Sequence, residues 1–185
     1  MIRDIQNVDD DIIRKKRIIE QTLYSDPDIV EILCDPDIDT SCPEDLLWSS
    51  IWPFIRIPGM QDESKNHITF SIGDMGLSSR NDVMKNQYVQ FVIFVHKDLI
   101  KTNYGMARHD CLGYLLKDIF HLSNILGSQM NLVSSTEGAT DTDYITRTLR
   151  FEMTTPNSIQ PYQTNKYERD SIVHSHDRRV KRESI

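Results

Sequence analysis

The chain has 185 residues, of which 38% are hydrophobic, and its formal net charge is −7. This length allows one domain of ordinary size plus a tail, and the modest hydrophobic share indicates that part of the chain lies outside the core. The acidic balance argues against a body that coats DNA, and no stretch approaches the roughly 20 apolar residues of a membrane helix. The N-terminus does not resemble a secretory signal, and three cysteines without metal-ligand spacing favour reduced thiols in a cytoplasm.

Charge is distributed unevenly along the chain. Eight acidic residues and no basic residue lie between Asp26 and Asp45, whereas residues 166–185 contain six basic and four acidic residues. The C-terminal segment therefore carries +2 and residues 1–165 carry −9. This distribution predicts an acidic body with a mildly basic tail.

The first fifty residues are predicted to be mainly short helices. Residues 9–24 place apolar side chains at helical spacing behind three aspartates, which favour a helix N-terminus. Residues 25–28 (Ser-Asp-Pro-Asp) predict a second helix start, because a capping side chain precedes a proline at the first helical position. Residues 41–44 repeat the same pattern.

Strands are predicted after this helical segment. Residues 54–57 indicate a short strand between two prolines, and residues 67–72 alternate as in a half-buried strand. Residues 88–95 are apolar on both faces, which is typical of a central, covered strand. The polar segment 74–85 is predicted to be a loop.

The second half of the chain is predicted to contain one long helix followed by two strands. Residues 105–126 have a broad apolar face that ends at Gly127. Residues 130–133 indicate a short strand, and residues 138–143 a turn-rich loop. Residues 144–153 alternate as a half-exposed strand, whose inward face is interrupted by Arg147.

This order of elements predicts an α+β fold in three segments. The core is expected to be an antiparallel or mixed β-sheet of about four to five strands with a long helix packed on one face. The predicted segments are a helical N-terminus at 1–50, the α+β core domain at 51–156 and an extended C-terminal arm at 157–185. The arm is polar with isolated apolar residues, so we expect it to be disordered when free or to lie across a partner.

Several clusters suggest metal binding, but none is complete. Acidic residues alternate over residues 35–39 as in a calcium loop, yet Thr40 replaces the required glycine and Leu46 the bidentate glutamate. A solvated acidic loop is the better interpretation. Two histidine pairs could chelate a metal but lack a third ligand at useful spacing; they are His174 with His176, and His96 with His109. No metal or cofactor is predicted.

The sequence also suggests no catalytic residue. Cys111 follows His109 and Asp110, but adjacent side chains on a helix diverge, so Cys111 is interpreted as buried packing. The chain contains no phosphate-binding glycine loop and no G-x-S-x-G. Residues 96–98 (His-Lys-Asp) and 63–65 (Glu-Ser-Lys) are poor substitutes for a nuclease motif. We therefore expect a protein that is not an enzyme, with a small nuclease as a weaker alternative.

The C-terminal arm supplies the candidate interface residues. Its basic end could contact nucleic acid, or it could dock on the acidic body of a neighbouring subunit. The candidates combine aromatic, aliphatic and cationic side chains: Tyr162, Tyr167, Ile172, Val173, Arg178, Arg179, Lys181 and Arg182.

Five segments between residues 50 and 155 carry a resemblance to a known family. They are 52–58 (WPFIRIP), 67–72 (HITFSI), 87–96 (QYVQFVIFVH), 105–119 (GMARHDCLGYLLKDI) and 145–153 (ITRTLRFEM). Their order resembles the tail-terminator, or tail-completion, proteins of long-tailed bacteriophages. The long acidic N-terminus and the C-terminal extension depart from that pattern.

The resemblance implies a structural virion protein of the phage tail or neck that is assembled in the host cytoplasm. It implies a hexameric ring that caps the tail tube and joins the tail to the head connector. The expected partners are further copies of the chain, the tail tube protein and the connector or stopper protein. DNA would pass through the lumen without specific binding, and no membrane would be involved. The alternatives are another neck subunit, such as a stopper or adaptor, and a free cytoplasmic regulator.

Overall fold

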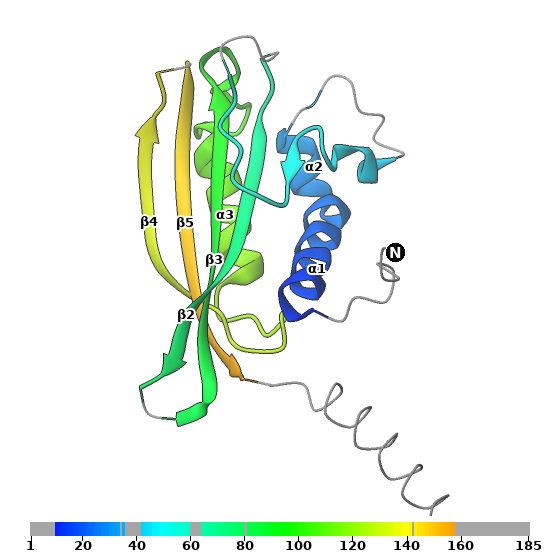
Figure 1. The fold of residues 1–185 in the computed structure, drawn as a ribbon. Coiled ribbons are helices and arrows are strands. Elements are labelled where there is room, and N and C mark those ends of the chain that lie inside the picture. The colour runs from blue at the N-terminus through cyan, green and yellow to red at the C-terminus, as the bar shows by residue number, and fades with distance from the viewer. Residues whose placement is uncertain are drawn as a thin grey trace, which may run out of the picture.

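A mixed sheet of five strands forms the centre of the molecule in this computed structural model, which describes residues 10–33, 35, 42–59, 64–79, 81–141 and 143–157 (Figure 1). The strand order is β1-β2-β3-β5-β4, and β1 pairs with β2 in parallel while the other pairs are antiparallel. The bounds are β1 Ile51–Trp52, β2 His67–Ser78, β3 Asn81–His96, β4 Asn131–Ala139 and β5 Tyr144–Pro156.

Helix α3 (Arg108–Phe120) packs on one face of this sheet, and α1 and α2 lie beside it (Figure 1). The predicted α+β class, the mixed sheet of about five strands, the packed helix and the helical N-terminus are confirmed. Buried side chains of α1 and α2 belong to the same hydrophobic cluster as the sheet.

The two N-terminal helices begin where the sequence predicts. Helix α1 (Asp11–Ser25) starts after Asp10, whose carboxylate accepts hydrogen bonds from the backbone N–H groups of Ile12 and Ile13 at 2.9 and 3.1 Å. Helix α2 (Pro27–Leu33) starts after Asp26, which caps it in the same way. Residues 43–46 form a 3₁₀ turn rather than a longer helix.

The core is centred on the middle strand. Phe91 on β3 lies 4.9 Å from the Phe120 ring of α3, 5.8 Å from the Phe151 ring of β5 and 5.9 Å from the Phe70 ring of β2, measured between ring centroids. The opposite face of β3 is also buried, because Val92 and Phe94 pack with Tyr144. The prediction of a central strand covered on both faces is therefore confirmed.

One predicted strand is wrong, and so is one predicted loop. Residues 54–57 do not form a strand; the strand is β1, which pairs Ile51 with Ile68. The ladder stops at Pro53 because proline has no N–H to donate, and Phe54 and Ile57 beyond it are exposed.

The segment 74–85 is not a loop. Strands β2 and β3 continue through it as a long hairpin, with register shifts between Asp74 and Gly76 and between Leu77 and Ser78. The hairpin projects beyond the helical layer (Figure 1). Most of its side chains lie outside the core, and the backbone ladder is supplemented across the strands by the Lys85 ammonium, which lies 3.4 Å from the Asp74 carboxylate.

The long helix is shorter than its apolar pattern indicates. It ends at Phe120, and Leu122 takes a left-handed φ of 60° while its N–H donates to the Met130 carbonyl at 2.7 Å. The later strands are longer than predicted, so that Gly138 lies within β4 and not in a loop. The arm at 157–185 lies, except for Asn157, outside the described residues.

A polar network connects the start of α1 to the base of the hairpin. The buried Lys15 ammonium donates to Asp11 at 2.8 Å and to the side-chain oxygen of Gln87 at 2.5 Å. Gln87 in turn donates to Asp11 at 3.1 Å and to Asp74 at 2.7 Å. Lys85 lies 3.7 Å from the Asp11 carboxylate. The network therefore satisfies a buried cation and holds α1 against β3.

Opposing effects act on the pKa of Asp11. Burial raises it, but the hydrogen bond and charge of Lys15, the hydrogen bond from Gln87 and the charge of Lys85 outweigh burial. The net pKa of Asp11 lies below its usual 3.8. A carboxyl with a lowered folded pKa contributes stability at neutral pH, and this stability is lost as the pH falls through the folded pKa.

We expect Asp11→Asn to lower the free energy of unfolding by about 2 kcal/mol at neutral pH, because Lys15 loses its anionic partner. The difference from the wild type should shrink as the pH falls below 3.8 and through the lowered folded pKa of Asp11, because the wild-type carboxyl then also becomes protonated. Urea unfolding at a series of pH values measures it, with Asp45→Asn at an exposed acid as the control. A difference that stays constant down to about pH 2 would contradict the role of the Asp11 charge.

Candidate functional site

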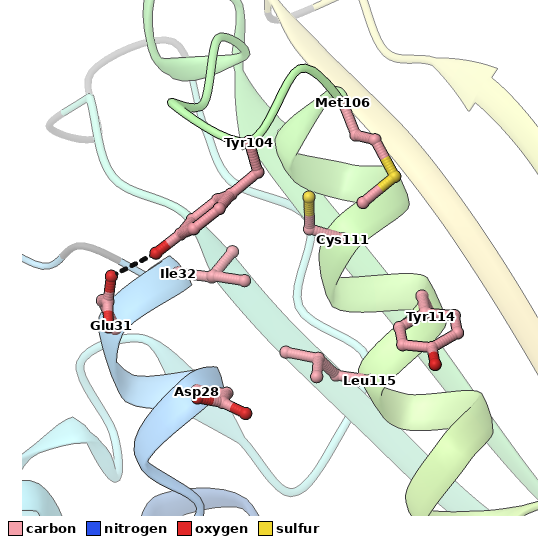
Figure 2. Close-up of a pocket in the computed structure, with 8 residues that line it drawn as sticks. All are labelled: Asp28, Glu31, Ile32, Tyr104, Met106, Cys111, Tyr114 and Leu115. Carbon is pink, nitrogen blue, oxygen red and sulfur yellow. Dashed lines mark hydrogen bonds between the residues drawn. The ribbon is translucent and has the colours of Figure 1, made fainter.

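A groove lies between α2 and the first turns of α3, closed at one end by the loop that precedes α3 (Figure 2). It encloses about 280 Å³. The walls come from three segments, with side chains that are mostly apolar or aromatic and two carboxylates on α2: Asp28, Glu31, Ile32, Tyr104, Met106, Cys111, Tyr114 and Leu115.

Tyr104 spans one end of the groove. Its hydroxyl donates a hydrogen bond to Glu31 on α2, and Figure 2 shows the ring reaching across from the loop. This hydrogen bond and the negative charge of Glu31 raise the pKa of the Tyr104 phenol above its usual 10.0. Tyr104 therefore remains neutral at physiological pH and serves as a donor to α2.

Arg108 holds the loop in place. Its guanidinium donates to the carbonyl oxygens of Leu99, at 2.7 Å, and of Ile32. Ile32 lies in the last turn of α2, where carbonyl groups lack partners within the helix. Arg108 therefore ties the loop and α3 to the end of α2.

Cys111 lies in the groove, but its neighbours in sequence face elsewhere. The thiol is buried and free, as the sequence predicted, and it points toward the side of Tyr104 and Met106 (Figure 2). Asp110 instead lines a second hollow on the other side of α3. The structure therefore does not bring a thiol, an imidazole and a carboxylate together at this position.

Arg147 lines the second hollow, which encloses about 590 Å³ between α3 and β5. Its guanidinium donates to Asp110 and lies 3.8 Å from the Glu137 carboxylate. It also donates to the Ser135 hydroxyl at 3.3 Å. The charge that interrupts the inward face of β5 is therefore paired with acids from two other elements.

His109, Asp110 and Glu137 form a group of possible metal ligands. Their ligand atoms all lie within 4.8 Å of one another. However, the Asp110 oxygen that would bind a metal already accepts from Arg147. A divalent ion would have to displace this guanidinium, so the donor set fits an ion-pair network better than a metal centre. His96, the predicted partner of His109, instead accepts from the Asp98 backbone at 3.4 Å.

Another surface, which we call the aromatic patch, consists of the exposed Trp48 and Phe54 and the half-buried Trp52 between them in sequence. Ring centroids lie 5.9 Å apart for Trp48 and Trp52, and 5.7 Å apart for Trp52 and Phe54. The Arg56 guanidinium lies 4.2 Å from the centre of the Trp52 ring. Trp48 is 60% exposed, which is unusual for so large an apolar side chain.

The backbone at the aromatic patch is strained. The backbone φ of Trp48 is 68°. This left-handed conformation is unfavourable for any residue that has a Cβ atom. The turn is held by Asp35, whose carboxylate accepts from the hydroxyls of Ser49 and Ser50 at 3.0 and 2.7 Å and lies 3.5 Å from Lys65. Asp35, the first acid of the calcium-like run, therefore orders this turn.

Several of the predicted residues lie in segments other than those that the structure describes. Residues 36–40, His174 and His176 lie outside the described residues, as do all eight candidate interface residues: Tyr162, Tyr167, Ile172, Val173, Arg178, Arg179, Lys181 and Arg182. The sequence did not single out the groove or the aromatic patch. Two tryptophans within five residues of each other, in an otherwise aromatic-poor N-terminal region, were the available signal for the patch.

Comparison with known proteins identifies the family. The profile of the YomW family matches residues 26–153, which is more than half of the chain. The protein therefore belongs to the YomW family, a Bacillus phage-type family. No curated protein matches the chain. No helix in the described part of the chain has the length and apolarity needed to span a bilayer.

We expect Gly113→Ala on α3 to destabilise the fold by about 1 kcal/mol. An added Cβ would lie 2.6 Å from the Arg147 Cδ atom, so the guanidinium would have to leave Asp110. In an Arg147→Ala background the same change should instead stabilise by about 0.5–1 kcal/mol, because alanine has the better helix propensity. Urea unfolding of the four variants measures this, and the same sign in both backgrounds would contradict the packing argument.

Proposed function

We propose that the protein is a structural subunit of a phage particle and acts as a tail terminator. In this proposal, copies of the chain close into a six-fold ring that caps the tail tube and joins the tail to the head connector. Membership of a phage-type family and the α+β fold support it. The observation that carries it is the exposed aromatic patch built on a strained turn.

The aromatic patch has the composition of an interface centre. Tryptophan is among the residue types that contribute most to binding energy between proteins. Three apolar side chains in this region are exposed to water: Trp48 at 60%, Phe54 at 44% and Ile57 at 67%. A partner that covered them would remove this apolar area from water. Strained backbone conformations cluster at binding and active sites, where the surrounding structure holds a side chain in position for binding.

A second apolar surface lies at the other end of β2. The projecting hairpin exposes Met75, Leu77 and Val83, which are 40%, 55% and 67% accessible. Two different apolar surfaces on one subunit suit head-to-tail contacts, which close into a ring when the rotation between subunits divides a full turn. The same subunit would then present its remaining faces to the tail tube protein and to the connector or stopper protein.

The role as a building block involves no chemical step. Within the described residues, the acids and bases at the second hollow neutralise one another, with Arg147 between Asp110 and Glu137. The acidic body, at −9 over residues 1–165, would repel phosphate, so that DNA would pass through the lumen without specific binding.

Light scattering of the purified full chain tests the ring directly. We expect a mass six times the 21.6 kDa of one chain, or, if the ring forms only on the tail tube, an increase of that size over the mass of the tube. Electron microscopy should then show the ring at one end of the tube. A protein that stays a monomer and binds neither tube nor connector would overturn the proposal.

We expect Trp48→Gly to abolish assembly while the fold persists. Glycine adopts a φ of 68° without strain, which offsets the lost ring contacts, so stability should change by less than about 1 kcal/mol. The matched control is Leu122→Gly, a change at another exposed apolar residue with positive φ, which should assemble normally. If light scattering shows that Trp48→Gly assembles like the wild type, the aromatic patch is not part of the interface between subunits.

A further inference from the structure

The groove between α2 and α3 combines an apolar floor with an acidic rim. Ile32, Cys111 and Leu115 form the floor, and the Asp28 and Glu31 carboxylates stand on the α2 side. Both acids are exposed. Such a surface suits an apolar side chain flanked by cations, because burial and charge attraction then act together.

The C-terminal arm of this chain contains a segment of that kind. Residues 178–182 read Arg-Arg-Val-Lys-Arg, so that one aliphatic side chain is flanked by four cations. Extended over five residues, this segment spans roughly 17 Å, comparable to one side of a short helix such as α2. Its charge is opposite in sign to the carboxylates on the rim of the groove.

The groove and the start of the arm lie at opposite ends of the sheet. The loop before α3 follows the end of β3 at His96, which pairs with Tyr144, whereas the arm follows β5 at Pro156. Strand β5 has 13 residues, so these ends lie roughly 40 Å apart. The 21 residues between Pro156 and Arg178 could span at most ~70 Å when fully extended, so the chain is long enough to reach a groove on its own subunit or on a neighbour.

This geometry favours the groove of a second copy. To reach the groove of its own subunit, the arm would have to run back along the whole length of the sheet, and closing a larger gap costs more chain entropy. A neighbouring subunit in a ring can place its groove closer to Pro156. The acidic body and the basic tail would then contact each other between copies.

We propose that residues 178–182 of one copy bind the groove between α2 and α3 of a neighbouring copy. Val180 packs on Ile32, Cys111 and Leu115, while the flanking cations pair with Asp28 and Glu31. This inference rests on the proposed assembly into a ring, because it requires a neighbour. The arm acts as a strap that joins adjacent subunits.

Site-specific photocrosslinking in the full chain tests this contact. Val180 is replaced by a benzophenone-bearing amino acid, and isotopically light and heavy copies are mixed before irradiation. We expect crosslinked peptides from residues 28–32 or 104–115, with the two partners carrying different isotopes. Crosslinks that map only to other surfaces, or that join peptides of the same isotope only, would overturn the proposal.

A charge reversal tests whether the acidic rim of the groove attracts the basic arm. Asp28→Lys should lower the crosslink yield at the groove about fivefold, because attraction to the arm becomes repulsion. Asp141→Lys, at an exposed acid on the turn between β4 and β5, is the matched control and should leave the yield unchanged. Equal crosslink yields in the two variants would overturn the proposal that the acidic rim of the groove binds the cations of the arm.

Light scattering of the same samples separates this inference from the proposed function. A six-chain mass without crosslinks at the groove would overturn the strap and leave the ring intact. A monomeric mass together with the absence of crosslinks between copies would instead point to failure of the ring itself. The two measurements on one sample therefore decide the two proposals separately.

Discussion

Contact between Phe91 and the rings around it determines the arrangement of the other elements. Phe91 lies on the middle strand, and its neighbours Phe70, Phe120 and Phe151 come from β2, α3 and β5. Such rings bury large apolar areas and prefer particular orientations, so they fix α3 against the sheet in one position. That position sets one wall of the groove and places Asp110 opposite Arg147.

The surfaces that we connect with function lie at the margins of this core. The aromatic patch, the projecting hairpin and the groove each leave large apolar side chains partly or fully in water. Trp48, Leu77 and Tyr114 are examples, each more than half exposed. In a building block, neighbouring subunits would complete the burial that one chain leaves unfinished, and the low hydrophobic share of the sequence fits this description.

The sequence predicted less of the candidate sites than of the fold. Arg147 stood out because it interrupts an apolar face, but its partner Asp110 precedes it by 37 residues and has no local relation to it. The bond between Tyr104 and Glu31 joins residues 73 apart in the chain. The positive φ of Trp48 arises in the turn between a 3₁₀ segment and β1, and no residue type in that turn indicates it from the sequence.

Local signals in the sequence determined the caps at Asp10 and Asp26, the covered central strand, the α+β class and the division into acidic body and basic tail. These features depend on residues within a few positions of one another, or on composition alone. Only the tertiary structure decided that the hairpin extends through 74–85, that α3 ends at Phe120, and that a groove and an aromatic patch exist. Strand pairing, helix ends and surface hollows depend on contacts between residues far apart in the chain, which periodicity does not encode.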